Sequence, residues 1–303
     1  MGVIMYNAER KQSFIRYKKD TTELANNIVA CFNDAEIFEE KYGKDLCDWT
    51  SQEIVGYLKY INTNKVSTLT VLVNMLRIYT DWCIANSLVL DHQNHYYEVT
   101  QDIINTCVDT TSLAGSIMTR RFLMNKLIHV YNASDRFVLL GSFEGIRTMD
   151  FPGIKISDIK NGTLTLKNRT IKISEDLFQI ASEANAETSY ISPIRKLDIA
   201  LANTGYILKA RVEAELDKIP TTELSVRFNR IMKYLDLKHI TMKDLRESGR
   251  IEYIINIMRE RSMSLDDVLA NYRSDIENQY GKIQNIPSYK ALYGPIIEGM
   301  LND

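Results

Sequence analysis

Cysteine, proline and tryptophan are scarce in this chain of 303 residues, which contains four, five and two of them respectively. The cysteines are Cys31, Cys47, Cys83 and Cys107. They show neither the Cys-x-x-Cys nor the His/Cys spacing of a metal site. Because three of them fall in helical patterns, we expect buried free thiols in a reducing compartment. His92 and His95 do not complete a ligand set either, so no metal and no other cofactor is expected.

Long apolar runs are also missing. None approaches the ~20 residues that cross a bilayer, and no signal peptide precedes the charged opening. With 45% apolar and 25% charged residues, the composition is that of an ordinary globular protein, which we expect in the cytoplasm and away from membranes. The net charge of -2 leaves no general excess of cations. Any basic surface that binds a polyanion must therefore be local.

The length is sufficient for two domains, and residues 1–107 are predicted to form the first, an all-helical one. Apolar residues at three- and four-residue steps predict helices over residues 9–19, 22–41 and 67–85. Thr50 and Glu53 form a capping box, which predicts that another helix begins there. A linker is expected near residues 107–112. Taken alone, this pattern of apolar residues is equally compatible with a helical bundle of unknown function.

The second domain, residues 113–303, contains the one clear β-signal. Residues 162–166 and 170–173 alternate in polarity around a turn at 167–169, which predicts a hairpin. The fold class is therefore mainly α with a small β-hairpin or sheet. Residues 195–261 hold 14 Lys/Arg against 10 Asp/Glu, which makes this stretch locally basic.

Three short motifs stand out in the second domain. Gly145-Ile-Arg147-Thr-Met-Asp150 closes an apolar helical run, and Lys243-Asp-Leu-Arg246 opens a helical pattern with one buried face. Asn271 stands nine residues before Tyr280. Alone, each pattern is compatible with surface side chains that form salt bridges.

In this order the motifs resemble the tyrosine recombinases, the phage-integrase family. The resemblance covers about residues 113–285. It matches Arg147 and Arg246 to the two family arginines and Tyr280 to the nucleophile. The lysine of the family hairpin is Lys167, or Lys172 in the alternative register. The helical first domain is similar to the core-binding domain of this family.

The chemistry of that family explains these residue types. Two guanidinium groups can hold the oxygens of a phosphodiester under attack, a tyrosine can form a covalent phosphotyrosyl link, and a lysine can protonate the leaving oxygen. This sequence departs from the family at three places. Lys243 replaces a histidine, Asn271 replaces a histidine or tryptophan, and Pro152 interrupts the first arginine motif. These departures favour a site that binds phosphate without cleaving DNA.

A closer resemblance is to the MrpR-type master repressors of SPβ-like Bacillus prophages, carried by residues 5–14, Tyr79-Thr-Asp-Trp-Cys83 and Gln93-Asn-His95. It implies a repressor that maintains lysogeny by binding operator repeats in double-stranded DNA, and it leaves self-association on DNA open. No catalytic residue is then expected. The vestigial set is Arg147, Lys167, Lys243, Arg246, Asn271 and Tyr280. The residues expected to bind DNA are Arg147, Lys167, Lys172, Lys243, Arg246 and Tyr280. An active recombinase with Tyr280 as nucleophile is the alternative, and a helical protein-interaction module is the third.

Overall fold

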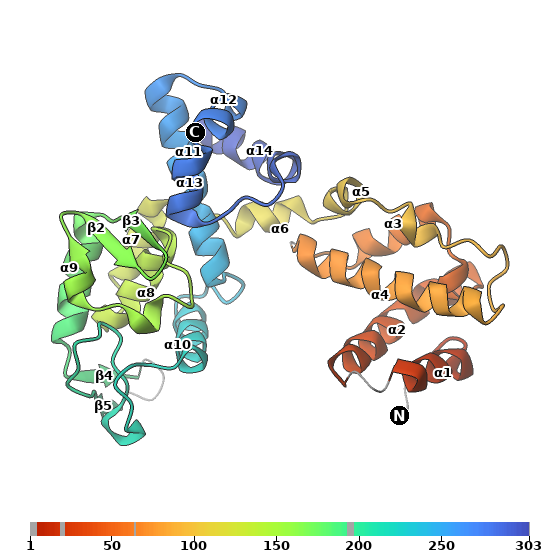
Figure 1. Cartoon of the computed structure of the whole chain (residues 1–303), viewed down its shortest axis with the longest axis horizontal. Helices are drawn as coiled ribbons and strands as arrows, with labels where there is room; N and C mark the ends of the chain where they lie inside the picture. The colour runs from red at the N-terminus through yellow and green to blue at the C-terminus, as the bar shows by residue number, and fades with distance from the viewer. Residues whose placement is uncertain (1–4, 19–21, 64, 193–196, 303) are drawn as a thin grey trace. The chain divides into compact units, whose positions relative to one another are not determined.

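The computed structural model describes residues 5–18, 22–63, 65–192 and 197–302. It divides into two compact units, Met1–Leu113 and Ala114–Asp303 (Figure 1). Within the described ranges, no helix combines the length and apolar composition needed to cross a membrane. Lys19 of the first predicted helix, and Arg195 and Lys196 of the basic stretch, lie outside the described residues.

All the regular secondary structure described in the first unit is helical. Its elements are α1 (Ala8–Lys18), α2 (Thr22–Tyr42), η1 (Leu46–Asp48), α3 (Ser51–Tyr60), α4 (Val66–Ala85), η2 (His95–Tyr97), α5 (Gln101–Thr106) and α6 (Thr110–Gly115). The predicted helices are confirmed to within about a residue at each described end. The capping box is also confirmed, because Thr50 and Glu53 satisfy each other's backbone N–H groups.

Aromatic rings fill the core of the first unit. Phe14 from α1, Phe32 from α2 and Tyr79 from α4 pack edge to face, with ring centroids 4.9 to 6.3 Å apart. All four cysteines are buried and free, as predicted. The segment predicted as a linker is partly helical, because α6 begins at Thr110. The Asp109 side chain accepts hydrogen bonds from the N–H groups of Thr111 and Ser112 and so caps the start of α6.

The second unit combines helices with two small sheets. Its elements are α7 (Arg120–Leu127), α8 (Ala133–Phe143), η3 (Phe151–Gly153), η4 (Ile156–Asp158), β1 (Ile159–Lys160), β2 (Thr163–Leu166), β3 (Arg169–Lys172), α9 (Glu175–Ala186), β4 (Ser189–Ile191), β5 (Asp198–Ala200), η5 (Val212–Ala214), α10 (Thr221–Tyr234), α11 (Met242–Arg261), α12 (Leu265–Asn271), α13 (Arg273–Tyr280) and α14 (Ile286–Asn302). The mainly helical fold with a small hairpin is confirmed. Pro152 lies in the single turn η3.

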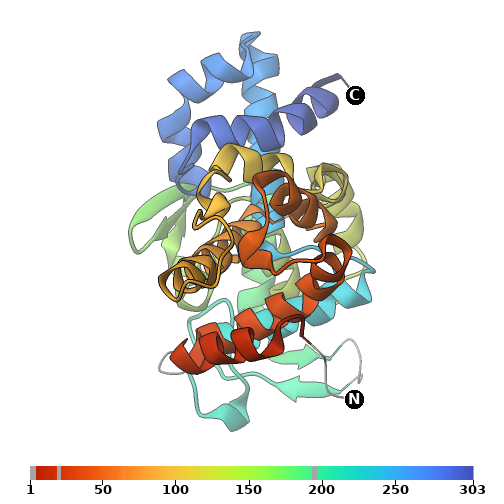
Figure 2. The same cartoon turned by 90° about the vertical axis from the view of Figure 1, so that its right-hand side faces the viewer.

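Strands β1, β2 and β3 form an antiparallel sheet, in which Leu166 pairs with Arg169 across the predicted hairpin. Two features were not predicted: β1, and the separate pair β4–β5, which lies apart from this sheet within the unit (Figure 2). These strands are only two or three residues long, too short for an alternating pattern to be recognised.

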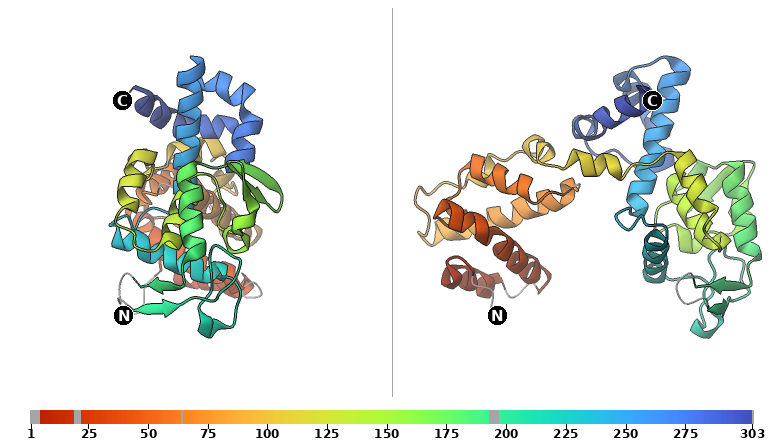
Figure 3. Two further views of the ribbon diagram at one scale, coloured as in Figure 1. Left: turned by 90° about the vertical axis from the view of Figure 1, so that its left-hand side faces the viewer. Right: turned by 180° about the vertical axis from the view of Figure 1, so that it is seen from behind.

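Helix α8 is the centre of the second unit, because nearly every one of its side chains is buried. The sheet, α9, α10 and the start of α11 contribute to the core around it. A second apolar cluster forms where α12, α13 and α14 gather around the rest of α11 (Figure 3). The two clusters meet along α8 and α11, and this is where the sequence motifs come together.

Candidate functional site

The turn after α8 positions Arg147. The helix ends in a Schellman motif, in which Ile146 N–H donates to Gly141 O at 2.8 Å and Gly145 N–H donates to Ser142 O at 3.1 Å. Gly145 has φ +107°, and a Cβ there would lie 2.3 Å from the carbonyl oxygen of Gln279. Only glycine fits this position, because both the dihedral and the space exclude a side chain. The chain therefore leaves α8 in one direction, with Arg147 two residues later.

Arg147 is paired with Asp150. Its Nε lies 2.9 Å from one carboxylate oxygen and its Nη2 lies 3.2 Å from the other, and 42% of its side chain stays exposed. Hydrogen bonding to Asp150 raises the pKa of the Arg147 guanidinium. The predicted arginine is thus accessible, but its charge is already partly balanced by a carboxylate.

A third arginine, Arg169, joins this pair, and the sequence analysis missed it. It lies 3.6 Å from Asp150 and donates to the carbonyl oxygens of Gly145 at 2.7 Å and Gln279 at 2.8 Å. Burial, and then the charge of Arg147, lowers the pKa of Arg169. The signal was the strand alternation, because Arg169 shares the inward face of β3 with Ile171. Because the predicted turn included Arg169, its inward position on β3 was not recognised.

Arg246 differs from the other two arginines in lacking an ion-pair partner among the described residues. It lies in the second turn of α11, whose start is fixed by a capping box between Thr241 and Asp244. Among the described residues it forms no hydrogen bond or ion pair, and its buried Nε is unsatisfied. Burial, followed by the charge of Arg250, lowers the pKa of Arg246. A half-buried guanidinium without a partner is costly unless an anion binds to it.

Arg147, Arg169 and Arg246, which we call the arginine cluster, all lie within the influence of one carboxylate, Asp150, and Glu247 also acts on Arg246. Each of the three either binds Asp150 or has its pKa shifted by it. The Arg147 charge lowers the pKa of both other arginines, so the groups are close enough to repel one another. An anion with several oxygens, such as a phosphate, would relieve this repulsion and supply the missing acceptors.

Tyr280, the last residue of α13, is only 6% exposed. Its ring lies 3.3 and 3.2 Å from the positions that a Cβ would occupy on Gly145 and Gly249, and 5.8 Å from the Tyr253 ring. Burial, followed by the charge of Glu144, raises the pKa of Tyr280. Neither Arg147 nor Arg246 is among the charged groups with the largest effect on it. These surroundings keep the hydroxyl protonated, whereas a nucleophile needs a lowered pKa or an adjacent base.

Helix α13 is held against β3 by the residues just before Tyr280. Gln279 donates from its amide to Lys172 O at 2.8 Å and accepts from Lys172 N–H at 3.0 Å, like the next strand of the sheet. Asn278 donates to Thr170 O at 2.9 Å. The tyrosine is therefore fixed in its buried position by side chains that the sequence motifs do not include.

The remaining predicted residues lie outside the arginine cluster. Lys167 is exposed in the turn between β2 and β3, and it lines a hollow together with Asp150. Lys172, Lys243 and Asn271 are exposed, and no hydrogen bond or ion pair joins their side chains to the cluster in the described part of the chain. The choice between Lys167 and Lys172 stays open, although only Lys167 lies beside a residue of the site.

Comparison with known proteins agrees with the order of these parts. The model of the MrpR N-terminal core-binding domain matches residues 5–85, and that of the MrpR C-terminal catalytic domain matches residues 118–294. The chain therefore has a core-binding domain followed by a catalytic-type domain. It belongs to the MrpR family, which confirms the resemblance found in the sequence.

Several individual proteins are similar over nearly the whole chain. The SPbeta prophage-derived uncharacterized protein YopR of Bacillus subtilis (strain 168) is 20% identical, with 94% of each chain covered. A lambda integrase dimer bound to a COC′ core site is 15% identical with a TM-score of 0.46, with 95% of each chain covered. An integrase from mycobacterium phage Brujita is 13% identical with a TM-score of 0.31, covering 94% of this chain and 96% of that one.

Proposed function

We propose that this protein is a sequence-specific double-stranded DNA-binding repressor, which maintains the lysogeny of a phage in the bacterial cytoplasm by binding operator repeats. In this proposal its tyrosine-recombinase fold has lost recombination activity. The observation that carries it is the arginine cluster, in which Arg246 has no ion-pair partner among the described residues, while Tyr280 is buried. Phosphate contacts provide much of the affinity for DNA and need no nucleophile.

Membership of the MrpR family supports the same proposal, because the sequence resemblance is to master repressors of prophages. Residues 1–107 would act as the core-binding domain and contribute DNA contacts of their own. The net charge of -2 fits a protein whose cations are concentrated at a few sites.

One reaction tests both parts of the proposal. The protein is incubated with prophage DNA that carries candidate repeats, including a copy nicked near the repeat to trap a covalent product. A native gel then reports binding, and a denaturing gel reports a covalent adduct. We expect a salt-sensitive shift, with a slope near 0.9 per phosphate neutralised, and no adduct. Binding that does not depend on salt, or that survives deletion of residues 1–107 unchanged, would contradict the proposal.

An active tyrosine recombinase is the second candidate, and one observation favours it. The Tyr280 ring lies against Gly145, two residues before Arg147, and against Gly249, three residues after Arg246. In this candidate function the tyrosine leaves its buried position and its hydroxyl attacks a phosphate held by the two arginines. A covalent DNA adduct of the wild-type protein would support this second candidate function.

The two arginines should differ in their effect on DNA binding. Arg246→Ala is expected to weaken binding to operator and random DNA alike by about 1–3 kcal/mol, because it removes a charged donor with no other partner. Arg147→Ala should have a smaller effect, since Arg147 exchanges its bonds with Asp150 for bonds with phosphate. Gel-shift titrations measure both, with Arg230→Ala, an exposed arginine on α10, as the matched control. Lost discrimination between operator and random DNA at unchanged affinity would mean that an arginine reads bases instead.

Replacing the tyrosine should leave repression intact. Tyr280→Phe removes only a hydroxyl that makes no hydrogen bond among the described residues, so DNA affinity should change by no more than about tenfold. The variant should still repress in a lysogen, as measured by spontaneous phage release. Loss of repression with unchanged DNA affinity and folding would assign the hydroxyl a role that this proposal does not contain.

A further inference from the structure

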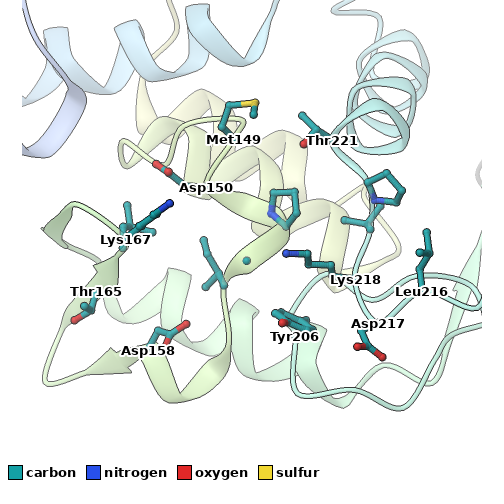
Figure 4. Close-up of a pocket in the computed structure, with 16 residues that line it drawn as sticks. Met149, Asp150, Asp158, Thr165, Lys167, Tyr206, Leu216, Asp217, Lys218 and Thr221 are labelled. Atoms are coloured by element: carbon teal, nitrogen blue, oxygen red, sulfur yellow. The ribbon is translucent and has the colours of Figure 1, made fainter.

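A hollow of about 890 Å³ opens beside the arginine cluster in the second unit, and Asp150 belongs to both. Its walls come from residues 149–158, the hairpin turn and residues 206–221. Lys167 and Lys218 extend into it from opposite sides (Figure 4). Such a space would hold about 30 water molecules at the share of volume that water has in the liquid. It is much larger than a single phosphate ion requires.

Two lysines share the ring of Tyr206, which lines this hollow together with Lys218. The Nζ atoms of Lys155 and Lys218 lie 4.8 and 5.7 Å from the ring centroid of Tyr206. Neither lysine forms an ion pair within the described ranges of the chain. The ring attracts each cation but carries no net negative charge, so it does not neutralise either ammonium group. An anion bound by both ammonium groups would supply that negative charge.

Backbone pairing positions these three side chains. Lys155 and Tyr206 form an antiparallel β-bridge, and Ile207 N–H donates to Ile154 O at 3.0 Å beside it. The segment that carries Lys218 is attached to the same strand-like stretch, because Ile219 N–H donates to Leu208 O at 3.2 Å. The lysines therefore leave neighbouring, hydrogen-bonded backbones, and their stems need little ordering to reach a common ligand.

The carboxylates around the hollow are mostly engaged elsewhere. Asp150 binds Arg147 and lies 3.6 Å from Arg169. Asp158 accepts a hydrogen bond at 2.8 Å from the backbone N–H of Lys155. Asp217 is exposed, where water and salt screen its charge. In the described part of the chain none of these three carboxylates forms an ion pair with Lys155, Lys167 or Lys218, so the lysines remain available to an external anion.

We propose that Lys155, Tyr206 and Lys218 form a second phosphate site, which binds the backbone of the same DNA duplex that the arginine cluster contacts. This inference rests on the proposed DNA-binding function and extends it. A continuous polyanion fits better than a free ion, because the hollow is large and its lining includes both Lys218 and the Asp150 that pairs with Arg147. The site contacts phosphate and does not read bases, so it sets affinity and the path of the strand.

The double variant Lys155→Ala/Lys218→Ala tests this site. We expect its affinity for operator and random DNA to fall about tenfold at ~0.1 M salt, and the salt slope to decrease by about 0.9, the loss of one phosphate contact. Lys155→Arg/Lys218→Arg should keep most of the binding. Lys233→Ala, an exposed lysine on α10, is the charge control. Circular dichroism melts should match the wild type, since all of these side chains are exposed.

Phosphate-ethylation interference then locates the contact. At one phosphate, ethylation should block binding by the wild type but no longer affect binding by the double variant. At the phosphate that Arg246 contacts, identified in the same way with Arg246→Ala, ethylation should still block binding by the double variant. If the wild type binds no DNA, the proposed function and this inference both fail. If the wild type binds DNA and the double variant has the same affinity and salt slope, only the inference fails. It also fails if inorganic phosphate stabilises the wild type but not the double variant, while both bind DNA equally.

Discussion

Gly249→Ala is expected to lower the free energy of unfolding of the second unit by about 3 kcal/mol or more. Helix α11 crosses α8 at this glycine, and a Cβ there would lie 1.7 Å from the carbonyl oxygen of Phe143. That atom belongs to a buried helix backbone, so it cannot rotate away as a side chain could. The helices must separate, which also disturbs the Tyr280 ring, 3.2 Å from the same position.

The two tryptophans allow this effect to be measured in one unit at a time. Trp49 and Trp82 both belong to the first unit, so their fluorescence follows that unit alone, whereas far-ultraviolet circular dichroism follows both. The Gly249→Ala variant should lose helical signal early in a denaturant titration while the fluorescence transition stays in place. Gly299→Ala is the matched control, because this helical glycine in α14 has open space around it and alanine should stabilise it slightly. Equal midpoints for the two variants would refute the steric argument.

Asp135→Ala should destabilise the second unit by about 3–5 kcal/mol. Asp135 accepts a hydrogen bond at 2.8 Å from Arg227, whose guanidinium is almost fully buried, 4.0 Å from the ring centroid of Tyr190. Removing the carboxylate leaves a charge that cannot be deprotonated in a place that water does not reach. The same denaturant titration by circular dichroism measures the loss.

An exposed ion pair of the same unit is the control for this prediction. Glu183→Ala breaks the pair with Arg136, in which both side chains are partly exposed, and should cost less than about 1 kcal/mol. A double variant that replaces both Asp135 and Arg227 with apolar residues should recover part of the loss. If Asp135→Ala and Glu183→Ala lower the free energy of unfolding equally, the buried pair contributes no more to stability than the exposed one.

The helices were predictable because their signals are local. The capping box of Thr50 and Glu53 and the apolar spacing along α4 depend on residues within one or two turns of each other. The hairpin was predictable for the same reason, since alternation and a two-residue turn lie in one short segment. Strands β4 and β5 were missed because each has only three residues, too few for an alternating pattern to be recognised. Their backbone pairing joins residues 7 to 11 apart in the chain.

The candidate site was only partly predictable. Arg147 and Arg246 could be selected by their order and spacing in the sequence. Arg169 could not, because its partners at Asn278 and Gln279 stand 109 and 110 residues away along the chain. Lys155 and Lys218 form no recognisable motif either, and only the fold of the chain around Tyr206 places them together.

The sequence by itself determined the family of this protein, its mainly helical architecture and the identity of two arginines and one tyrosine. Only the tertiary structure decided what surrounds them. It balances Arg147 with Asp150, gives Arg246 no ion-pair partner among the described residues, and places Tyr280 under the influence of Glu144. The physical reason is that electrostatic free energy depends on burial and on distances between charges. Burial and charge–charge distances depend on segments that are far apart in the chain and pack together in the fold. They therefore cannot be predicted from the spacing of residues within one motif.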